Sequence, residues 1–478
     1  MSTSRKTGQS TLGDAALAGL SLDRSDREPM HRQLAGALKR LILAQTLPSG
    51  SRLPASRSFA EELGVSRATV VAAVEELIAE GYAEGRHGSG VYVVPDLPDH
   101  VLQAELRDQT RPKPALARPD GVRPFRPAAP ELALFPHEIW ARIMLRLWRA
   151  PAPELLTNPD PLGFAPLRQA IAEHLGAFRG LDCAPEQVIV TSGAAEAVEL
   201  LAQSVLKRGD RVLVEEPGYP LMRNVLAEIG VVLDPVAVDG EGFDIAKAVQ
   251  PARAALVTPA RHYPLGATMP LARRLALLDW ARSTKAVIIE DDYDSEYRYH
   301  GRPLPALMGV DEAGVTIYLG SFSKTMLPGL RLAFLVAPRT LLAPISAAMR
   351  ERGPRVSLMM QPVLAEFMRQ GHYATHIRRM RRLYARRQKV LIDAIRRHGK
   401  GILSAAPEPA GMHVVATLEN GMEDREASRR AGLAKIVAPA VSDYFMGKPT
   451  RRGLVLGYAG FDEATIEKGV KALIAALA

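Results

Sequence analysis

Apolar side chains recur at helical spacing in three short segments near the N-terminus. The first helix is predicted at residues 31–45, where the apolar stripe consists of Leu34, Leu38, Leu41 and Ile42. A second is predicted at 57–63, closed by Gly64, and a third at 67–79, which Ser66 caps. Three short helices with a glycine turn between the last two predict a helix-turn-helix.

Residues 81–94 follow these helices and predict two short strands around a glycine-rich turn, the wing of a winged helix. We therefore place an α+β winged helix-turn-helix domain at residues 22–94. Residues 95–124 lose periodicity and gather prolines, which predicts a semi-stiff, extended linker. Such a linker is long enough to carry the first domain toward a neighbouring subunit.

Beyond the linker, short branched apolar runs alternate with helical stretches, and we treat residues 125–478 as one α/β domain. Helices are predicted at 194–206 and 271–282, and strands at 187–191, 211–215, 254–258, 286–290 and 315–319. Strands that alternate with helices predict a mainly parallel sheet covered on both faces. Ligands then bind at the carboxyl ends of the strands.

Composition is that of an ordinary multidomain protein. The 478 residues suggest two or three domains, and shares of 47% hydrophobic and 24% charged residues suffice for a proper core. The single cysteine, Cys183, excludes an intrachain disulfide framework and favours the reducing cytoplasm. We expect neither a signal peptide nor a membrane span.

Net charge does not by itself predict DNA binding. The chain carries +9, but residues 1–94 hold 11 Lys and Arg against 10 Asp and Glu, which gives 11 − 10 = +1. Part of the excess lies in 377–389, where a solvated helix face explains it. The first domain is therefore identified by its pattern and not by its charge.

A lysine among small hydroxyl residues marks the candidate chemistry. Residues 320–331 read Gly-Ser-Phe-Ser-Lys-Thr-Met-Leu-Pro-Gly-Leu-Arg, with Lys324 near the centre and Gly329 and Arg331 at the end. An amine can form a Schiff base with an aldehyde, hydroxyls and a guanidinium can hold a phosphate, and glycine lets the backbone approach. The segment predicts a pocket for pyridoxal 5'-phosphate (PLP).

Two further segments follow predicted strands. Residues 192–196, Ser-Gly-Ala-Ala-Glu, open a helix whose N–H groups suit a phosphate, although plain strand-helix geometry explains them as well. Residues 290–296 gather acids that suit either a metal ion or the nitrogen of a pyridine ring. Lys324 lies a short distance further along the chain, which favours the pyridine, and we expect no metal.

The first domain resembles the winged helix of GntR-type bacterial transcription regulators at residues 53–57, 63–70 and 80–91. The resemblance implies that the third helix enters the major groove of DNA and the wing tip reaches the minor groove. Ser66 as a mere cap and Arg67 as a mere surface charge are the alternative. The implied DNA contacts are Arg57, Ser66, Arg67, Thr69, Arg86, His87 and Ser89.

Residues 125–478 resemble a fold type I PLP-dependent aminotransferase, as found in MocR/GabR-type members of the GntR family. The resemblance implies a Schiff base on Lys324, a contact of Asp291 with the pyridine nitrogen, and a hydrogen bond from Tyr293 to the phenolic oxygen. Asp292 or Asp294 could replace Asp291. Tyr219 would stack on the ring unless it is a core aromatic. The phosphate would be held by Ser192, Gly193, Ala194, Ser321, Ser323 and Arg331.

Three places depart from the family pattern. Arg261-His262 stands where a His-Gln pair is usual, Asn158 stands where tyrosine is common, and Ala195-Glu196 replaces Gln-Gln. The planar fork of Arg261 suits an effector carboxylate. Candidates of the same kind near the C-terminus are Arg451 and Arg452, and a solvated arginine is the alternative for each.

Together these features predict a cytoplasmic PLP-dependent regulator that senses a small amine, an amino acid or PLP itself. The resemblance implies a head-to-tail homodimer that binds paired half-sites of double-stranded operator DNA. The main alternative is a true aminotransferase with an accessory domain, since Lys324, Asp291 and Tyr293 are also the catalytic set. A DNA-binding protein with an empty, purely structural pocket is the third possibility.

Overall fold

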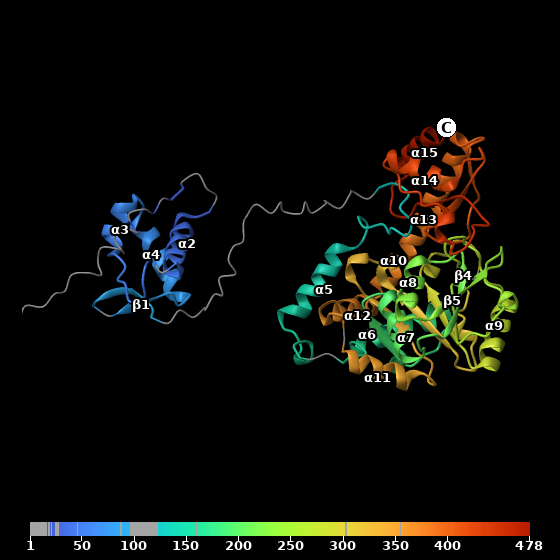
Figure 1. The fold of residues 1–478 in the computed structure, drawn as a ribbon, viewed down its shortest axis with the longest axis horizontal. Coiled ribbons are helices and arrows are strands. Elements are labelled where there is room, and N and C mark those ends of the chain that lie inside the picture. Colours follow the sequence, from blue (N-terminus) through green and yellow to red (C-terminus); the bar gives the residue numbers. More distant parts are fainter. Residues whose placement is uncertain are drawn as a thin grey trace, which may run out of the picture. The chain divides into compact units, whose positions relative to one another are not determined.

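The computed structural model describes residues 17, 20, 22–23, 28–44, 46–86, 88–95, 123–157, 160–301, 304–353 and 355–478. The chain divides into two compact units, residues 1–117 and 118–478, and each is described by itself (Figure 1). Residues 96–122 of the predicted linker lie outside the described residues, as do His87 and Asn158.

The first unit is a winged helix. Its elements are α2 (Met30–Leu43), α3 (Ser56–Leu63), α4 (Arg67–Ala79) and the antiparallel strands β1 (Ala83–Arg86) and β2 (Gly90–Val93). Helix α3 ends because Gly64 adopts the left-handed conformation at φ 64°, which glycine accepts without strain. The helices enclose a small apolar core, whose fully buried members include Leu34, Leu38, Phe59, Val70 and Leu77.

Ser66 is the N-cap of α4. Its Oγ accepts a hydrogen bond from the backbone N–H of Thr69 at 3.1 Å. We expect Ser66→Ala to destabilise α4 by about 1 kcal/mol, because one N–H of the first turn loses its side-chain acceptor. Hydrogen exchange of the α4 amides measures this. Ser58→Ala, which removes an exposed hydroxyl from α3, is the control and should leave exchange in α4 unchanged.

A seven-stranded sheet forms the centre of the second unit, in the order β3-β9-β8-β7-β6-β4-β5. All neighbours pair in parallel except β9, which runs antiparallel between β3 and β8. The bounds are β3 Val188–Thr191, β4 Arg211–Glu216, β5 Val232–Ala237, β6 Ala254–Val257, β7 Val287–Asp292, β8 Thr316–Ser321 and β9 Ala333–Val336. The mainly parallel sheet is confirmed, and β5 and β9 add to the five predicted strands.

Alternate side chains of the strands pack against helices on opposite faces of the sheet. Val212 and Val214 of β4 belong to the cluster with α7 and α8, whereas Leu213 between them packs with α9. This alternation follows from the pleat of a strand. The helices of this part are α6 (Ala165–Arg179), α7 (Ala194–Ser204), α8 (Pro220–Ile229), α9 (Leu271–Thr284), α10 (Phe322–Thr325) and α11 (Leu342–Arg352).

A smaller part of the second unit is built on a three-stranded antiparallel sheet, β10-β11-β12. Its strands are β10 (Leu403–Ala405), β11 (His413–Leu418) and β12 (Leu454–Gly457). The long helix α13 joins it to the large sheet, since both parts share one apolar cluster. The remaining helices are α5 (His137–Arg149), α12 (Gln361–Arg369), α13 (His372–His398), α14 (Asp424–Leu433) and α15 (Glu463–Leu477).

Candidate functional site

A cavity of about 740 Å³ lies at the carboxyl ends of the parallel strands. It is bordered by residues that follow β3, β4, β7 and β8, and by the segment 126–133. The predicted residues that line it are Gly193, Ala194, Tyr219, Asp291, Tyr293, Ser321, Ser323, Lys324 and Arg331. Residues from four separate stretches of sequence therefore share one site, in the position that open parallel sheets give to ligands.

Lys324 lies in α10, the short helix that follows β8 directly. Ser321 caps this helix, because its Oγ accepts from the N–H of Ser323 at 3.2 Å. Burial lowers the pKa of Lys324 and the charge of Arg126 acts in the same direction, whereas Asp294 and Asp291 oppose the shift. A lowered pKa leaves more of the amine uncharged, which is the form that attacks a carbonyl.

The three neighbouring aspartates have different surroundings. Asp291 lines the cavity, its carboxylate makes no hydrogen bond to another described residue, and its pKa is raised to about 7 by burial and by the charge of Asp292. Asp292 accepts hydrogen bonds at 2.8 Å from Arg179 Nε, the Tyr318 hydroxyl and the Ser295 hydroxyl. Of the three, only Asp291 presents a free carboxylate to the cavity.

The predicted phosphate residues line the cavity, with the exception of Ser192. A Cβ added to Gly193 would lie 3.3 Å from Arg331 Nη2, so glycine keeps room for the guanidinium at this point. Ser192 does not line the cavity, and its backbone N–H donates to Glu196 Oε2 at 2.6 Å. Glu196, which stands where the family usually has glutamine, thus accepts the hydrogen bond of an N–H group near the start of α7.

Aromatic side chains form one wall. Tyr219 is 40% exposed, which does not fit a core aromatic, and its ring meets Tyr263 edge to face at 5.4 Å. Tyr263 also contacts the ring of Tyr293 at 5.6 Å and hydrogen-bonds the hydroxyl of Tyr444 at 3.1 Å. Tyr263 was not among the predicted residues, although it stands next to the unusual pair Arg261-His262.

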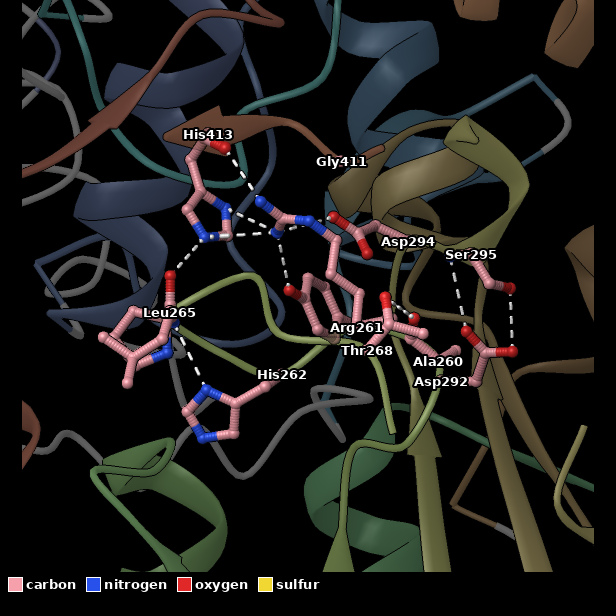
Figure 2. A network of polar contacts seen from close by, with 12 residues as sticks. Ala260, Arg261, His262, Leu265, Thr268, Asp292, Asp294, Ser295, Gly411 and His413 are labelled. Carbon is pink, nitrogen blue, oxygen red and sulfur yellow. Dashed lines mark hydrogen bonds and ion pairs between the residues drawn. The ribbon is translucent and has the colours of Figure 1, made fainter. Parts of the chain in front are cut away.

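Arg261 is buried, and its guanidinium lies between His413 and Asp294 (Figure 2). Its Nη1 donates to the Tyr293 hydroxyl at 2.9 Å and lies 3.5 Å from Asp294 Oδ2, while Nη2 donates to the backbone carbonyl of His413 at 2.9 Å. A Cβ at Gly411 would overlap its guanidinium. Arg261 does not line the first cavity, so its position favours orientation of Tyr293 over contact with an effector.

The other predicted effector residues also lie away from the cavity. Arg451 and Arg452 are exposed, and Arg452 forms an ion pair with Glu423.

His262, the second residue of the unusual pair, is buried, and its Nε2 donates to the backbone carbonyl of Pro217 at 2.9 Å. Burial lowers the pKa of His262 to about 3, so its ring is neutral. Neither this ring nor the two arginines offer a charge to the cavity.

Arg126 is the cavity cation that the sequence did not reveal. It stands at the start of the described part of the second unit, lines the cavity and forms no ion pair with another described residue. Glu131 of the same segment accepts from Arg387 Nη2 at 2.6 Å and from the N–H of Ala133 at 2.8 Å. Arg126 is therefore available to an anionic group, whereas Glu131 is occupied.

The predicted DNA contacts that the structure describes are exposed or half-buried side chains of α3, α4 and the wing. The Ser66 and Thr69 hydroxyls bond to one another at 2.8 Å, and Arg67 Nε donates to Ser56 Oγ at 3.3 Å. Arg57 and Arg86 make exposed ion pairs with Glu61 and Glu84, and Ser89 Oγ meets the Tyr92 hydroxyl at 2.8 Å.

No group of three or more His, Cys, Asp or Glu side chains among the described residues is placed to hold a metal ion. Within that part of the chain, no helix combines the length and apolar character that crossing a membrane requires.

Comparison with known proteins follows the division into two units. The family "Bacterial regulatory proteins, gntR family" matches residues 30–93, and "Aminotransferase class I and II" matches residues 140–473. The chain is 40% identical to the probable rhizopine catabolism regulatory protein MocR of Rhizobium meliloti, over 95% of each chain. It is 34% identical to the pyridoxine biosynthesis transcriptional regulator PdxR of Corynebacterium glutamicum, over 94% of this chain and 97% of PdxR.

Among solved structures, α-aminoadipate aminotransferase LysN of Thermus thermophilus, complexed with N-(5'-phosphopyridoxyl)-L-leucine, superposes with a TM-score of 0.68 and 29% identity. The match covers 75% of this chain and 92% of LysN. Both halves of the chain are thus assigned. The chain belongs to the MocR-type transcription regulators of the GntR family, in which a winged helix is joined to a fold type I aminotransferase domain.

Proposed function

We propose that the second unit binds PLP covalently through Lys324 and senses a small amine or amino acid by the release of that lysine. One observation carries the proposal: Lys324 and the unpaired carboxylate of Asp291 line the same cavity. LysN, which shares this fold, holds a phosphopyridoxyl compound. We further propose a cytoplasmic homodimer that presents two winged helices to paired half-sites of operator DNA.

The cavity residues fit PLP in charge and in space. The buried carboxylate of Asp291 suits a protonated pyridine nitrogen, which would supply the cationic partner that it lacks. Gly193 leaves room beside Arg331 for a phosphate, and the Ser321 and Ser323 hydroxyls lie nearby on the same wall. When bound, PLP supplies an electrophilic carbon that exchanges one amine for another.

The sensing step changes charges inside the cavity. Lys324, if displaced by an effector amine, would be a free amine in the cavity; burial opposes its protonation, whereas Asp294 and Asp291 favour it. The Tyr293 hydroxyl stays fixed by Arg261. An amine that is free in one state and bonded in the other interacts differently with these carboxylates, and only such a difference can shift a conformational equilibrium.

Arg126 favours amino acids over plain amines as effectors. We expect Arg126→Met to weaken the response to an amino acid about tenfold or more, because a charge-assisted hydrogen bond to the carboxylate is lost. The response to an amine without a carboxylate should change little. Titration of the visible absorbance of the PLP-loaded protein measures both responses. An equal loss for the two ligand types would contradict the role.

Two experiments test the proposal as a whole. Purified protein should show the visible absorbance of lysine-bound PLP, and its absence even after addition of PLP would refute the cofactor. Footprinting on DNA upstream of the gene, with and without PLP and a panel of amines, should show protection that depends on these ligands. Arg67→Ala should weaken that protection. Arg57→Ala tests whether α3, the second helix of the motif, also contacts the DNA.

A true aminotransferase is the second candidate, because Lys324, Asp291 and Tyr293 meet in one cavity as catalysis requires. Steady-state assays with a panel of amino donors and 2-oxo acids separate the two. Turnover at rates ordinary for enzymes would favour the enzyme, whereas ligand-dependent DNA binding with negligible turnover would favour the regulator.

A further inference from the structure

A second cavity of about 380 Å³ lies elsewhere in the same unit. It is formed by the C-terminal end of α6, the loop after β6, the 3-10 helix η4 (Ser295–Tyr297) with the residues that follow, and α13. Four arginines from these separate elements line it: Arg179, Arg261, Arg298 and Arg381. Such a concentration of guanidinium groups in one hollow is costly unless anions offset it.

Only two of the four arginines have carboxylate partners. Arg179 Nε pairs with Asp292 at 2.8 Å, and Arg261 Nη1 lies 3.5 Å from Asp294. Arg298 and Arg381 form no ion pair within the described part of the chain. Arg298 Nη1 reaches the carbonyl of His300 at 3.5 Å, and Arg381 Nε donates to the carbonyl of Glu296 at 2.9 Å. Two positive charges therefore lack a counter-ion.

The remaining acid of the cavity does little to neutralise them. Burial and the charge of Asp292 raise the pKa of Glu296, which favours the uncharged form of its carboxyl. His174, 4.0 Å from Glu296, has its pKa lowered to about 4 by burial and is neutral. In addition, Arg179 Nη2 is buried and has no hydrogen-bond partner in the described structure.

We propose that this second cavity binds a small oxyanion, a phosphate or carboxylate group, between Arg298 and Arg381 with Arg179 behind them. A guanidinium presents paired N–H donors that match the oxygens of either group. The site is separate from the first cavity, yet Arg261 lines it and also donates to the Tyr293 hydroxyl of the first. One side chain therefore contacts both sites.

Calorimetric titration of the full-length, PLP-saturated protein tests the proposal. The probes are inorganic phosphate and succinate, each at constant ionic strength, and the one that binds distinguishes a phosphate from a carboxylate ligand. We expect Arg381→Met and Arg298→Met each to weaken binding about tenfold or more. The matched control is Arg382→Met, an exposed arginine one position along α13, which should bind as the wild type does.

The site would be overturned by no binding of either probe at millimolar concentration, or by equal affinity in all three variants. A loss of binding in Arg331→Met alone would move the anion to the first cavity and also contradict the proposal. Protection of Arg298 and Arg381 from phenylglyoxal by phosphate, followed by mass spectrometry on the wild type, gives the same answer if a variant does not fold. Failure of PLP binding would show separately, as missing visible absorbance.

Discussion

Lys324→Ala should abolish covalent attachment of PLP, and the absorbance band of lysine-bound PLP should disappear and be replaced by that of the free aldehyde. The side chain supplies the only amine among the described residues that line the first cavity, so no neighbour can replace it there. The substituted protein retains Asp291 and Arg331 and should still bind PLP without a covalent bond, only more weakly. Reduction with borohydride followed by peptide mass spectrometry locates the attachment directly.

Two controls make this result specific. Lys324→Arg keeps a positive charge but cannot form the bond, so it should behave as the alanine variant does. Lys471→Ala removes an exposed lysine on α15 and should leave the absorbance intact. The band of lysine-bound PLP in Lys324→Ala, or a reduced label on another lysine in the wild type, would contradict the assignment.

The fold and much of the site could be predicted because their signals are local in sequence. Ser66 precedes its helix directly, and Lys324 follows a strand within a segment of twelve residues that carries its own hydroxyls and arginine. Strand β5 lacked such a signal, since Asp234 and Pro235 interrupt its apolar run at the sheet edge. Strand β9 is short and runs against its neighbours, which the alternating pattern did not anticipate.

The charges of the site could not be predicted, because tertiary contacts decide whether an arginine is free. Arg261 is held by His413, which lies 152 positions away, and Arg452 by Glu423. Arg126 reaches the cavity because its neighbour Phe125 accepts a hydrogen bond from the N–H of Gly457 at 2.9 Å. No pattern within the segment 123–133 predicts that contact.

The three aspartates at the end of β7 and just after it show the same limit. The sequence allowed Asp291, Asp292 or Asp294 to meet the pyridine nitrogen. In the structure Asp291 and Asp292 leave the strand on opposite faces, as the pleat requires. Asp292 faces Arg179, and the side chains of this pair are 2% and 5% exposed.

Asp292→Asn should therefore destabilise the second unit by about 3–5 kcal/mol, because Arg179 would stay buried without its counter-charge. Denaturant unfolding of cofactor-free protein measures this through tryptophan fluorescence, since Trp140, Trp148 and Trp280 all lie in that unit.

Asp291→Asn is the matched control. Its carboxylate has no partner, so removing the charge should cost less than about 1 kcal/mol or stabilise the cofactor-free protein. The affinity for PLP should show the opposite order: Asp291→Asn should lose most of it, and Asp292→Asn should lose less. Equal stability of the two variants would contradict the assignment of Asp292 to the stability of the fold and of Asp291 to cofactor binding.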